Sequence, residues 1–223
     1  MQQRKSKTVI IYFFLLIILG SINNISISKV KFDKVESINI SGLNFSDNEI
    51  MLEDLKNLSL ESIFLLDRSK ISKIIDRNTL IEKYEIFKKY PSTLVIEIEK
   101  TNLLANISKN GSIFIVGSNG KLIKKKLPSN NLPFIFGNPN ISDFLNLKKT
   151  IDSSNFSYNE IKNFYFYKSK RWDLELTNNI LIKLSKNNVK DSLDNVYNFL
   201  NNKNLKNIKV IDSRIKNQVI LND

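Results

Sequence analysis

The sequence has 223 residues, and 34 Lys and Arg against 22 Asp and Glu give a formal net charge of +12 at pH 7. It contains no Cys, which excludes disulfide bonds and thiol nucleophiles. It also contains no His, which excludes imidazole metal sites and catalytic triads whose base titrates near neutral pH. We therefore expect a protein that is not an enzyme and that needs no cofactor and no small-molecule substrate.

An unbroken apolar run, residues 8–19, lies close to the start of the chain. Such a run spans a membrane as a helix or belongs to a signal peptide that is removed, and a buried core helix is a third alternative. We favour a retained transmembrane helix over residues 8–27, because roughly 20 residues match a hydrocarbon core about 30 Å thick. The sequence after the run also lacks the small-residue pattern of a cleavage site. The anchor residues are Val9, Ile10, Phe13, Phe14, Leu15, Leu16, Ile17, Ile18 and Leu19.

Three basic residues, Arg4, Lys5 and Lys7, precede this run without any acidic residue. By the positive-inside rule they hold residues 1–7 in the cytoplasm as a short tail, and the rest of the protein lies across the membrane. A basic domain in that location would meet anionic lipid or acidic wall polymers, so we expect no nucleic-acid partner. A solvated cationic surface remains the simplest interpretation of the net charge.

After a polar connector over residues 28–34, residues 35–101 predict the order β-α-α-β-β. An alternating strand ends at Ser41-Gly42, and Ser46 and Glu49 have the spacing of a capping box at the start of a helix. Asp67 or Ser69 caps a second, shorter helix. The apolar positions expected on the two helices are Ile50, Leu52, Leu55 and Leu58, then Ile71, Ile74 and Ile75. Strands over residues 80–89 and 93–99 flank the turn Tyr90-Pro91-Ser92.

Residues 102–223 predict a larger, mostly antiparallel β-domain with peripheral helices, so the fold class is α+β. Asn110-Gly111 and Asn119-Gly120 are strong hairpin signals, and they separate strands over residues 103–109, 112–116 and 121–126. Two helices are expected, one over residues 143–151 and one with Val189, Leu193, Val196 and Leu200 on a single face. The remaining strands are expected over residues 161–168, 171–176, 180–184, 206–212 and 218–221.

Three groups of side chains could carry chemistry, and each has a simpler interpretation. Glu97 and Glu99 share one face of a strand, where solvated carboxylates need no catalytic role. The lysines 124–126 could hold a phosphate, but such a run is more often exposed loop. The aromatic residues 164–167 could stack bases, yet in a strand two rings point inward and two outward. We therefore expect none of them to be a catalytic site.

Several motifs together resemble the FtsQ/DivIB family of cell-division proteins. They are Ile38-x-Ile40-Ser41-Gly42, Lys89-Tyr90-Pro91-Ser92-Thr93-Leu94, Leu132-Pro133-Phe134-x-x-Gly137, Arg171-Trp172-x-Leu174 and Ile211-Asp212-Ser213-Arg214. The resemblance implies a POTRA domain over residues 35–101 and an FtsQ-type β-domain over residues 102–223, behind one membrane span. It also implies a single-pass protein of the bacterial inner membrane, with its bulk in the periplasm at the division septum.

The last strand of the chain is the candidate partner site. An edge strand displays unpaired backbone groups, which makes it a template for strand addition by another chain. The family resemblance implies that FtsB- and FtsL-type divisome proteins bind there, so that the protein links partners that control septal wall synthesis. The two alternatives are a POTRA-containing accessory of outer-membrane transport and a membrane-tethered cell-wall enzyme. The candidate contact residues are Ile215, Asn217, Val219, Ile220 and Leu221.

Overall fold

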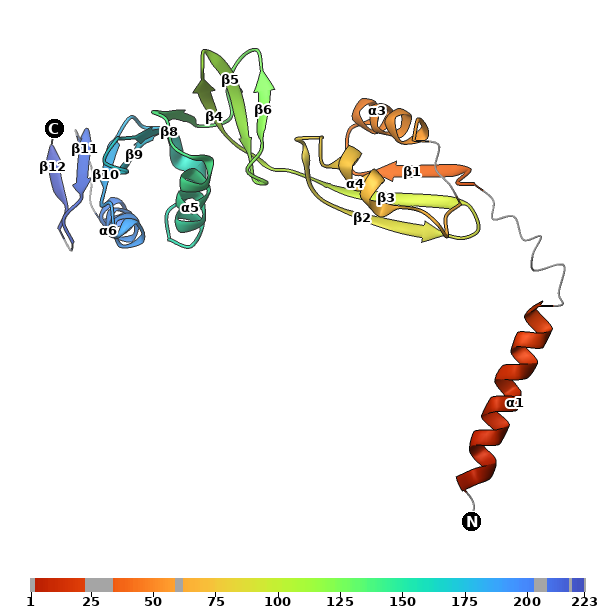
Figure 1. The fold of residues 1–223 in the computed structure, drawn as a ribbon. Coiled ribbons are helices and arrows are strands. Elements are labelled where there is room, and N and C mark those ends of the chain that lie inside the picture. The colour runs from red at the N-terminus through yellow and green to blue at the C-terminus, as the bar shows by residue number, and fades with distance from the viewer. Residues whose placement is uncertain (1–2, 23–33, 59–61, 203–207, 217, 223) are drawn as a thin grey trace.

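The computed structural model of the chain describes residues 3–22, 34–58, 62–202, 208–216 and 218–222 (Figure 1). Within these residues the fold is mixed α+β, as the sequence predicts, with helices beside a three-stranded sheet and a nine-stranded sheet. Each sheet has its own hydrophobic core.

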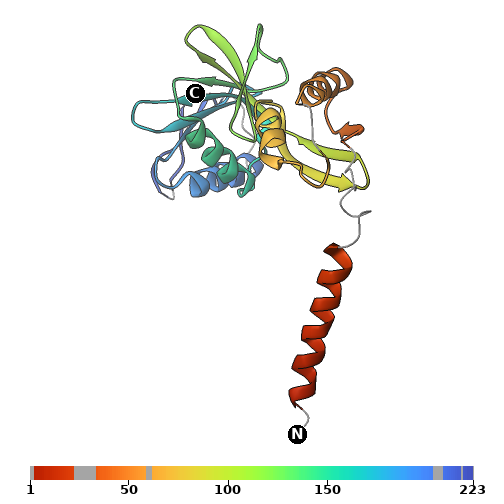
Figure 2. The same cartoon turned by 45° about the vertical axis from the view of Figure 1, so that its right-hand side comes forward.

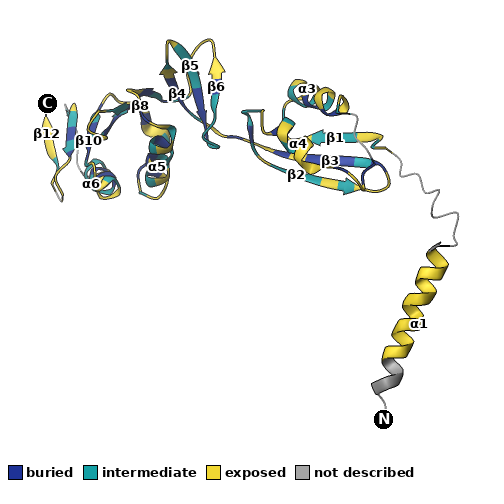
Figure 3. Cartoon of the chain, viewed as in Figure 1, coloured by how far each residue is buried: buried dark blue, intermediate teal, exposed yellow. Residues whose placement is uncertain are grey.

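The first helix, α1, runs from Gln3 to Ile22 and lies apart from both sheets in the two views (Figures 1 and 2). Its described side chains, from Lys7 to Ser21, are all exposed (Figure 3). The apolar ones are between 46% exposed at Leu15 and 70% exposed at Leu16. This exposure rules out the alternative of a buried core helix.

The predicted membrane span over residues 8–27 stays a prediction. Among the residues that the structure describes, no helix reaches the combined length and apolarity needed to cross a bilayer. Residues 23–27 of the predicted span and residues 28–33 of the connector lie outside the described residues, as do the side chains of Arg4 and Lys5.

The three-stranded sheet carries two helices on one face. Strand β3 lies at its centre, parallel to β1 and antiparallel to β2. The order along the chain is the predicted β-α-α-β-β. Side chains that alternate along β3, such as Leu94 and Ile96, pack against the helices. The elements are β1 (Ser37–Ser41), α3 (Phe45–Lys56), α4 (Arg68–Ile75), β2 (Ile81–Lys89) and β3 (Thr93–Lys100).

The predicted capping box at the start of α3 is wrong. The N-cap residue is Asn44, whose side chain makes no capping bond, and Ser46 already lies inside the first turn. The helix buries Met51 and Leu55, four residues apart, whereas Ile50 is exposed. The cap of α4 is confirmed, because the Asp67 side chain accepts a hydrogen bond from the Ser69 N–H at 2.9 Å.

The nine-stranded sheet has the order β12-β11-β10-β9-β8-β7-β4-β5-β6. Helices α5 and α6 and the 3-10 turn η1 pack beside it, with Phe144, Leu147, Leu193 and Val196 buried in its core. The strands are β4 (Leu103–Lys109), β5 (Ser112–Gly117), β6 (Leu122–Lys125), β7 (Phe134–Phe136), β8 (Ile161–Phe166), β9 (Trp172–Leu176), β10 (Leu181–Leu184), β11 (Val210–Ser213) and β12 (Ile220–Asn222). The helical segments are α5 (Ile141–Asp152), η1 (Tyr158–Glu160) and α6 (Val189–Asn202).

Three neighbouring pairs in this sheet are parallel, β4–β7, β7–β8 and β10–β11, and the other pairs are antiparallel. Parallel neighbours need a long crossover connection. Helices α5 and α6 provide two of them, because α5 connects β7 to β8 and α6 connects β10 to β11. The sequence predicts both helices, whereas the short strand β7 is an addition to the predicted strands.

Polar side chains join the two sheets at the turn between β5 and β6. The Asn119 Nδ2 donates to the carbonyl oxygens of Thr79 and Ile81 at 3.1 and 2.8 Å. The Lys121 Nζ donates to the carbonyl oxygen of Asp76, the C-cap of α4, at 2.9 Å. A cation at that position is favourable, because the carbonyl end of a helix carries partial negative charge.

A carboxylate adds to the same contact. The Glu82 Oε2 on β2 accepts hydrogen bonds from Thr101 Oγ1 at 2.9 Å and from Ser118 Oγ at 2.6 Å. We call Glu82, Thr101, Ser118, Asn119 and Lys121 the junction network. It connects the end of α4 and the start of β2 to the second sheet.

Candidate functional site at the terminal edge

Strand β12 is the last strand at one edge of the nine-stranded sheet. It pairs antiparallel with β11, with Leu221 opposite Ile211 and Ile220 opposite Asp212. Within the described part of the chain β11 is its one strand neighbour. The backbone groups along its other side are therefore not used in this sheet.

The four candidate contact residues that the structure describes fall into two groups. Ile215, Ile220 and Leu221 are exposed, at 54%, 48% and 38%. Val219 is half-buried and packs against the core of the nine-stranded sheet. Asn217 lies outside the described residues. Ile220 is thus better suited than Val219 to test binding, because a change at Val219 also disturbs core packing.

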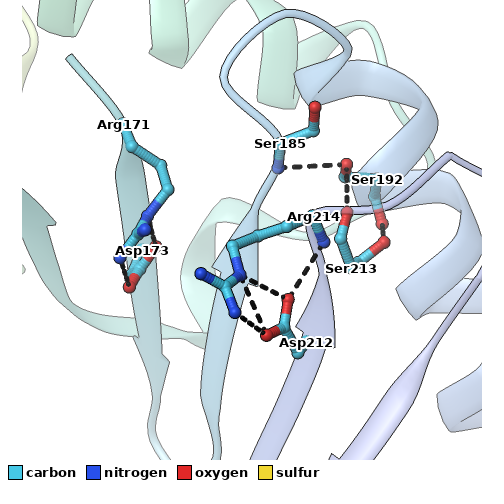
Figure 4. Close-up of polar contacts among 7 residues, drawn as sticks. All are labelled: Arg171, Asp173, Ser185, Ser192, Asp212, Ser213 and Arg214. Atoms are coloured by element: carbon cyan, nitrogen blue, oxygen red, sulfur yellow. Dashed lines mark hydrogen bonds and ion pairs between the residues drawn. The ribbon is translucent and has the colours of Figure 1, made fainter. Parts of the chain in front are cut away.

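Strand β11 is held in place by a pair of serines (Figure 4). The Ser192 Oγ on α6 donates to the Ser213 carbonyl oxygen at 2.8 Å, and the Ser213 Oγ donates to the Ser192 carbonyl oxygen at 3.3 Å. Both residues are buried. The Ser185 N–H after β10 also donates to the Ser192 Oγ, at 3.3 Å. These bonds connect β11, the neighbour of the edge strand, to β10 and α6.

Two ion pairs lie in the same part of the sheet, one next to Ser213 at the end of β11 and the other at the start of β9, two strands away (Figure 4). Arg214 donates from Nε and Nη2 to the Asp212 carboxylate at 2.9 and 2.6 Å. These hydrogen bonds lower the pKa of Asp212 and raise the pKa of Arg214. Arg171 donates to Asp173 at 3.0 and 3.1 Å, and Asp173 is fully buried. The charges of both carboxylates are therefore compensated within the sheet.

An aromatic row continues across β7 and β8. The ring centroid of Phe136 lies 4.8 Å from that of Phe134. The Phe136 ring also stacks on the Tyr165 ring, with centroids 5.1 Å apart. The Tyr165 hydroxyl donates to Glu175 Oε2 at 2.6 Å, and this hydrogen bond raises the pKa of Tyr165 to about 12. Hydrogen bonds from Asn163 and then from Tyr165 lower the pKa of Glu175. Phe136 is 44% exposed, so the row reaches solvent.

The other candidate groups behave as exposed surface or core. Glu99 forms an ion pair with Lys83 at 3.7 Å, with both side chains largely exposed. Lysines 124–126 lie exposed on and after the edge strand β6. The inward and outward alternation predicted for residues 164–167 is confirmed, because Phe164 and Phe166 pack in the core and Tyr167 is exposed. Among the described residues, no group of acidic side chains is arranged to hold a metal ion.

The two ion pairs and the serine pair were not predicted from the sequence. The ion pairs did have a signal, because Arg171 and Asp173, like Asp212 and Arg214, are two residues apart and so share one face of an extended chain. The contact between Ser192 and Ser213 had none, because it joins a helix and a strand that are far apart in sequence.

Two domain families match this chain. Residues 33–100 match the FtsQ-type POTRA domain, and residues 105–214 match the C-terminal domain of cell division protein FtsQ/DivIB. A POTRA domain followed by this C-terminal domain defines a class of bacterial division proteins.

Two relatives agree with these matches. DivIB of Bacillus subtilis (strain 168) is 27% identical over 175 residues, which cover 74% of this chain and 64% of that protein. FtsQ of Rickettsia bellii (strain RML369-C) is 26% identical over 189 residues, covering 83% of this chain and 70% of that protein. The chain belongs to the FtsQ/DivIB family of cell division proteins.

The chain spans less than two thirds of some relatives, since its match covers 51% of DivIB from Clostridium botulinum (strain Loch Maree / Type A3) at 27% identity over 60% of this chain. A solved structure, the major extracytoplasmic domain of DivIB from Geobacillus stearothermophilus, matches 42% of this chain and 85% of its own with a TM-score of 0.33 and 11% identity. That likeness is too low to support an argument about the fold.

Proposed function

We propose that this protein is a non-enzymatic scaffold of bacterial cell division that captures a partner by strand addition at β12. The observation that carries this proposal is the position of β12 at the edge of the nine-stranded sheet, with one side of the strand unpaired in the described chain. An extended partner segment that pairs with this side would gain main-chain hydrogen bonds, and its side chains would supply specificity.

The exposed apolar side chains at this edge support the same proposal. Ile215, Ile220 and Leu221 would be covered by an added strand, and the burial of apolar surface is the main favourable term in such binding. The serine pair between α6 and β11 keeps the receiving edge ordered before a partner arrives. The family resemblance points to FtsB- or FtsL-type membrane proteins as the partners, and to the coordination of septal wall synthesis as the outcome.

We further propose that the protein is attached to the inner membrane by α1. The support is an apolar helix whose described side chains are all exposed, next to the basic residues Arg4, Lys5 and Lys7. In this arrangement the N-terminus is cytoplasmic and the bulk is periplasmic. The POTRA domain over residues 35–101 positions the β-domain over residues 102–223 at the septum.

The strand-addition proposal predicts that Ile220→Asp abolishes capture of the partner. The full-length variant would be incubated in detergent with the extracytoplasmic part of an FtsB-type protein, and binding measured by calorimetry. The expected result is loss of binding with little change in the melting temperature, because Ile220 is 48% exposed and is not part of the core, and because Arg214 already compensates the charge of Asp212 opposite it. The matched control is Leu127→Asp, at a residue 77% exposed after β6. The site assignment is wrong if Ile220→Asp binds like the control.

A further inference from the structure

One end of the three-stranded sheet carries a cluster of large exposed apolar side chains. Phe64, Leu65 and Tyr90 are 51%, 68% and 59% exposed. The rings of Phe64 and Tyr90 lie 4.8 Å apart, although they come from loops that are distant in the sequence. We call these three residues the proximal cluster. Large apolar groups that gather in water are typical of an interaction surface.

The proximal cluster lies where the chain enters this sheet from α1. Tyr90 belongs to the turn between β2 and β3. In the same turn, the carbonyl oxygen of Ser92 accepts hydrogen bonds from the N–H groups of Glu36 and Ser37, at 2.9 and 3.4 Å. Lys34 forms a β-bridge with Ser62, two residues before Phe64. The opposite end of β3 leads through Thr101 to the nine-stranded sheet. The cluster therefore lies at the end of the sheet that Lys34, the first described residue after α1, joins.

Basic groups lie at the same end of the sheet as the proximal cluster. Lys34, Lys89 and Arg68 are exposed, and Arg68 lies across β2 with its Nη2 donating to the Ile86 carbonyl oxygen at 3.3 Å. Lys88 is half-buried beside them. Among the residues that the structure describes, the acidic groups at this end are Glu36 and Asp67, and each already accepts a hydrogen bond, from Ser92 Oγ and the Ser69 N–H. The described residues at this end therefore include more basic than acidic groups, while Asp33 and Glu61, next to Lys34 and Ser62 in the sequence, lie outside the described residues.

We propose that the proximal cluster sits in the interface of the membrane that holds α1, with the basic groups at the same end of the sheet on anionic lipid headgroups. Aromatic rings prefer the boundary between headgroups and hydrocarbon, and lysine and arginine next to a membrane are attracted to anionic lipids. The connection permits this, because residues 23–33 reach at most about 40 Å even when fully extended. The inference rests on the proposed membrane attachment of α1.

The test uses the full-length protein with single introduced cysteines, since the chain has no native Cys. Leu65→Cys reports on the proximal cluster, Phe13→Cys on α1, and Leu127→Cys is the matched control, an exposed leucine on the other sheet. Each variant carries an environment-sensitive fluorophore and is reconstituted into nanodiscs that contain anionic phospholipid and a nitroxide-labelled lipid. We expect a blue shift and nitroxide quenching at position 65, and a water-like spectrum with iodide quenching at position 127.

The outcomes separate this inference from the proposal it rests on. Lipid quenching at position 13 with a water-like spectrum at position 65 overturns the inference and leaves the attachment of α1 standing. A water-like spectrum at position 13 overturns both. Quenching by lipid at positions 65 and 127 alike indicates adsorption of the whole protein and overturns the specific surface. Protection of position 65 from iodide without lipid quenching means that protein covers it, which also overturns the inference.

The contribution of the cations is tested in the same assay. Changing Lys88 and Lys89 to Glu in the Leu65→Cys background is expected to remove the blue shift in anionic nanodiscs. The same change at Lys124 and Lys125, on the other sheet, is expected to leave the shift intact. An unchanged shift after the Lys88 and Lys89 substitutions contradicts the role assigned to anionic headgroups.

Discussion

The hydrogen bond between Tyr165 and Glu175 has a consequence for stability that depends on pH. Tyr165→Phe removes a 2.6 Å bond to a carboxylate, and at pH 7 we expect a loss of about 1 kcal/mol of unfolding free energy at this partly exposed site. Because folding raises the pKa of Tyr165 to about 12, the bond's contribution is complete below the unfolded pKa of about 10 and is lost as the pH rises through 12.

Urea unfolding of the wild type and the variant at pH 7, 10 and 12 measures this effect. The difference between the two proteins should be largest at pH 7 and should shrink toward pH 12. Tyr167→Phe is the control, because Phe preserves the ring that lies 4.6 Å from the Arg171 guanidinium. A difference that stays constant over the whole pH range contradicts the assignment of the raised pKa to this bond.

Single side chains were predictable from the sequence where their signal is local. The Asp67 cap was predictable because its side chain binds a backbone group only two residues away. The turn at Asn110 and Gly111 was predictable because these residue types favour the positive φ angles, 50° and 73°, that the turn requires. The reciprocal bonds of Ser192 and Ser213 depend on how α6 packs on β11, and no spacing in the sequence encodes that packing.

The end of β1 depends on a glycine for a steric reason. Gly42 has φ +108°, and a Cβ atom there would lie 1.7 Å from the Ile98 carbonyl oxygen of β3. We expect Gly42→Ala to destabilise the three-stranded sheet by about 3 kcal/mol or more, through both strain and the clash. Gly111 provides the control, because its φ is +73° but no atom beyond its own residue and its two chain neighbours lies within 4 Å of its Cβ position. Gly111→Ala should cost only about 1 kcal/mol.

Calorimetric melting of the two variants checks this prediction, with the melting temperature of Gly42→Ala expected well below that of Gly111→Ala. Equal shifts would mean that β1 ends differently from the structure.

Most helices and strands were predictable, and the exceptions have a common cause. Helix α5 was found because Phe144, Leu147 and Ile151 recur at helical spacing. Strand β7 was missed because Phe134–Phe136 is only three residues long and has no alternation to detect. The parallel pairs β7–β8 and β10–β11 join strands separated by a helix, and only the packing of that helix reveals such neighbours.

For the protein as a whole, the junction network is the feature that relates the two sheets. Changing Asn119 to Asp and Lys121 to Met removes the donors to the carbonyl oxygens at the end of α4 and the start of β2. We expect the two sheets to move relative to each other in the double variant, while each keeps its own core. Lys124→Met, on the adjacent strand, is the matched control.

Spin labels at Leu65→Cys and Leu127→Cys measure this motion, because the first label lies beside the three-stranded sheet and the second lies beside the nine-stranded sheet. The distribution of label distances should be narrow in the parent and in Lys124→Met, and broad in the double variant. A narrow distribution in all three proteins would show that other contacts fix the arrangement. This network was not predictable from the sequence, since Asn119 and Thr79 are 40 positions apart.

The junction network also sets a geometric limit on any strand that β12 receives. If α1 is held in a bilayer and the proximal cluster rests on the surface of that bilayer, the first sheet acts as a spacer of fixed length. The hydrogen-bonded turn between β5 and β6 then prevents the second sheet from tilting to compensate. The exposed edge of β12 then stays at a fixed distance from the membrane surface. A binding partner anchored in the same bilayer must therefore have a segment of matching length between its membrane anchor and the strand that pairs with β12. Adding or removing a few residues in that segment would abolish binding, although every contact residue stays the same.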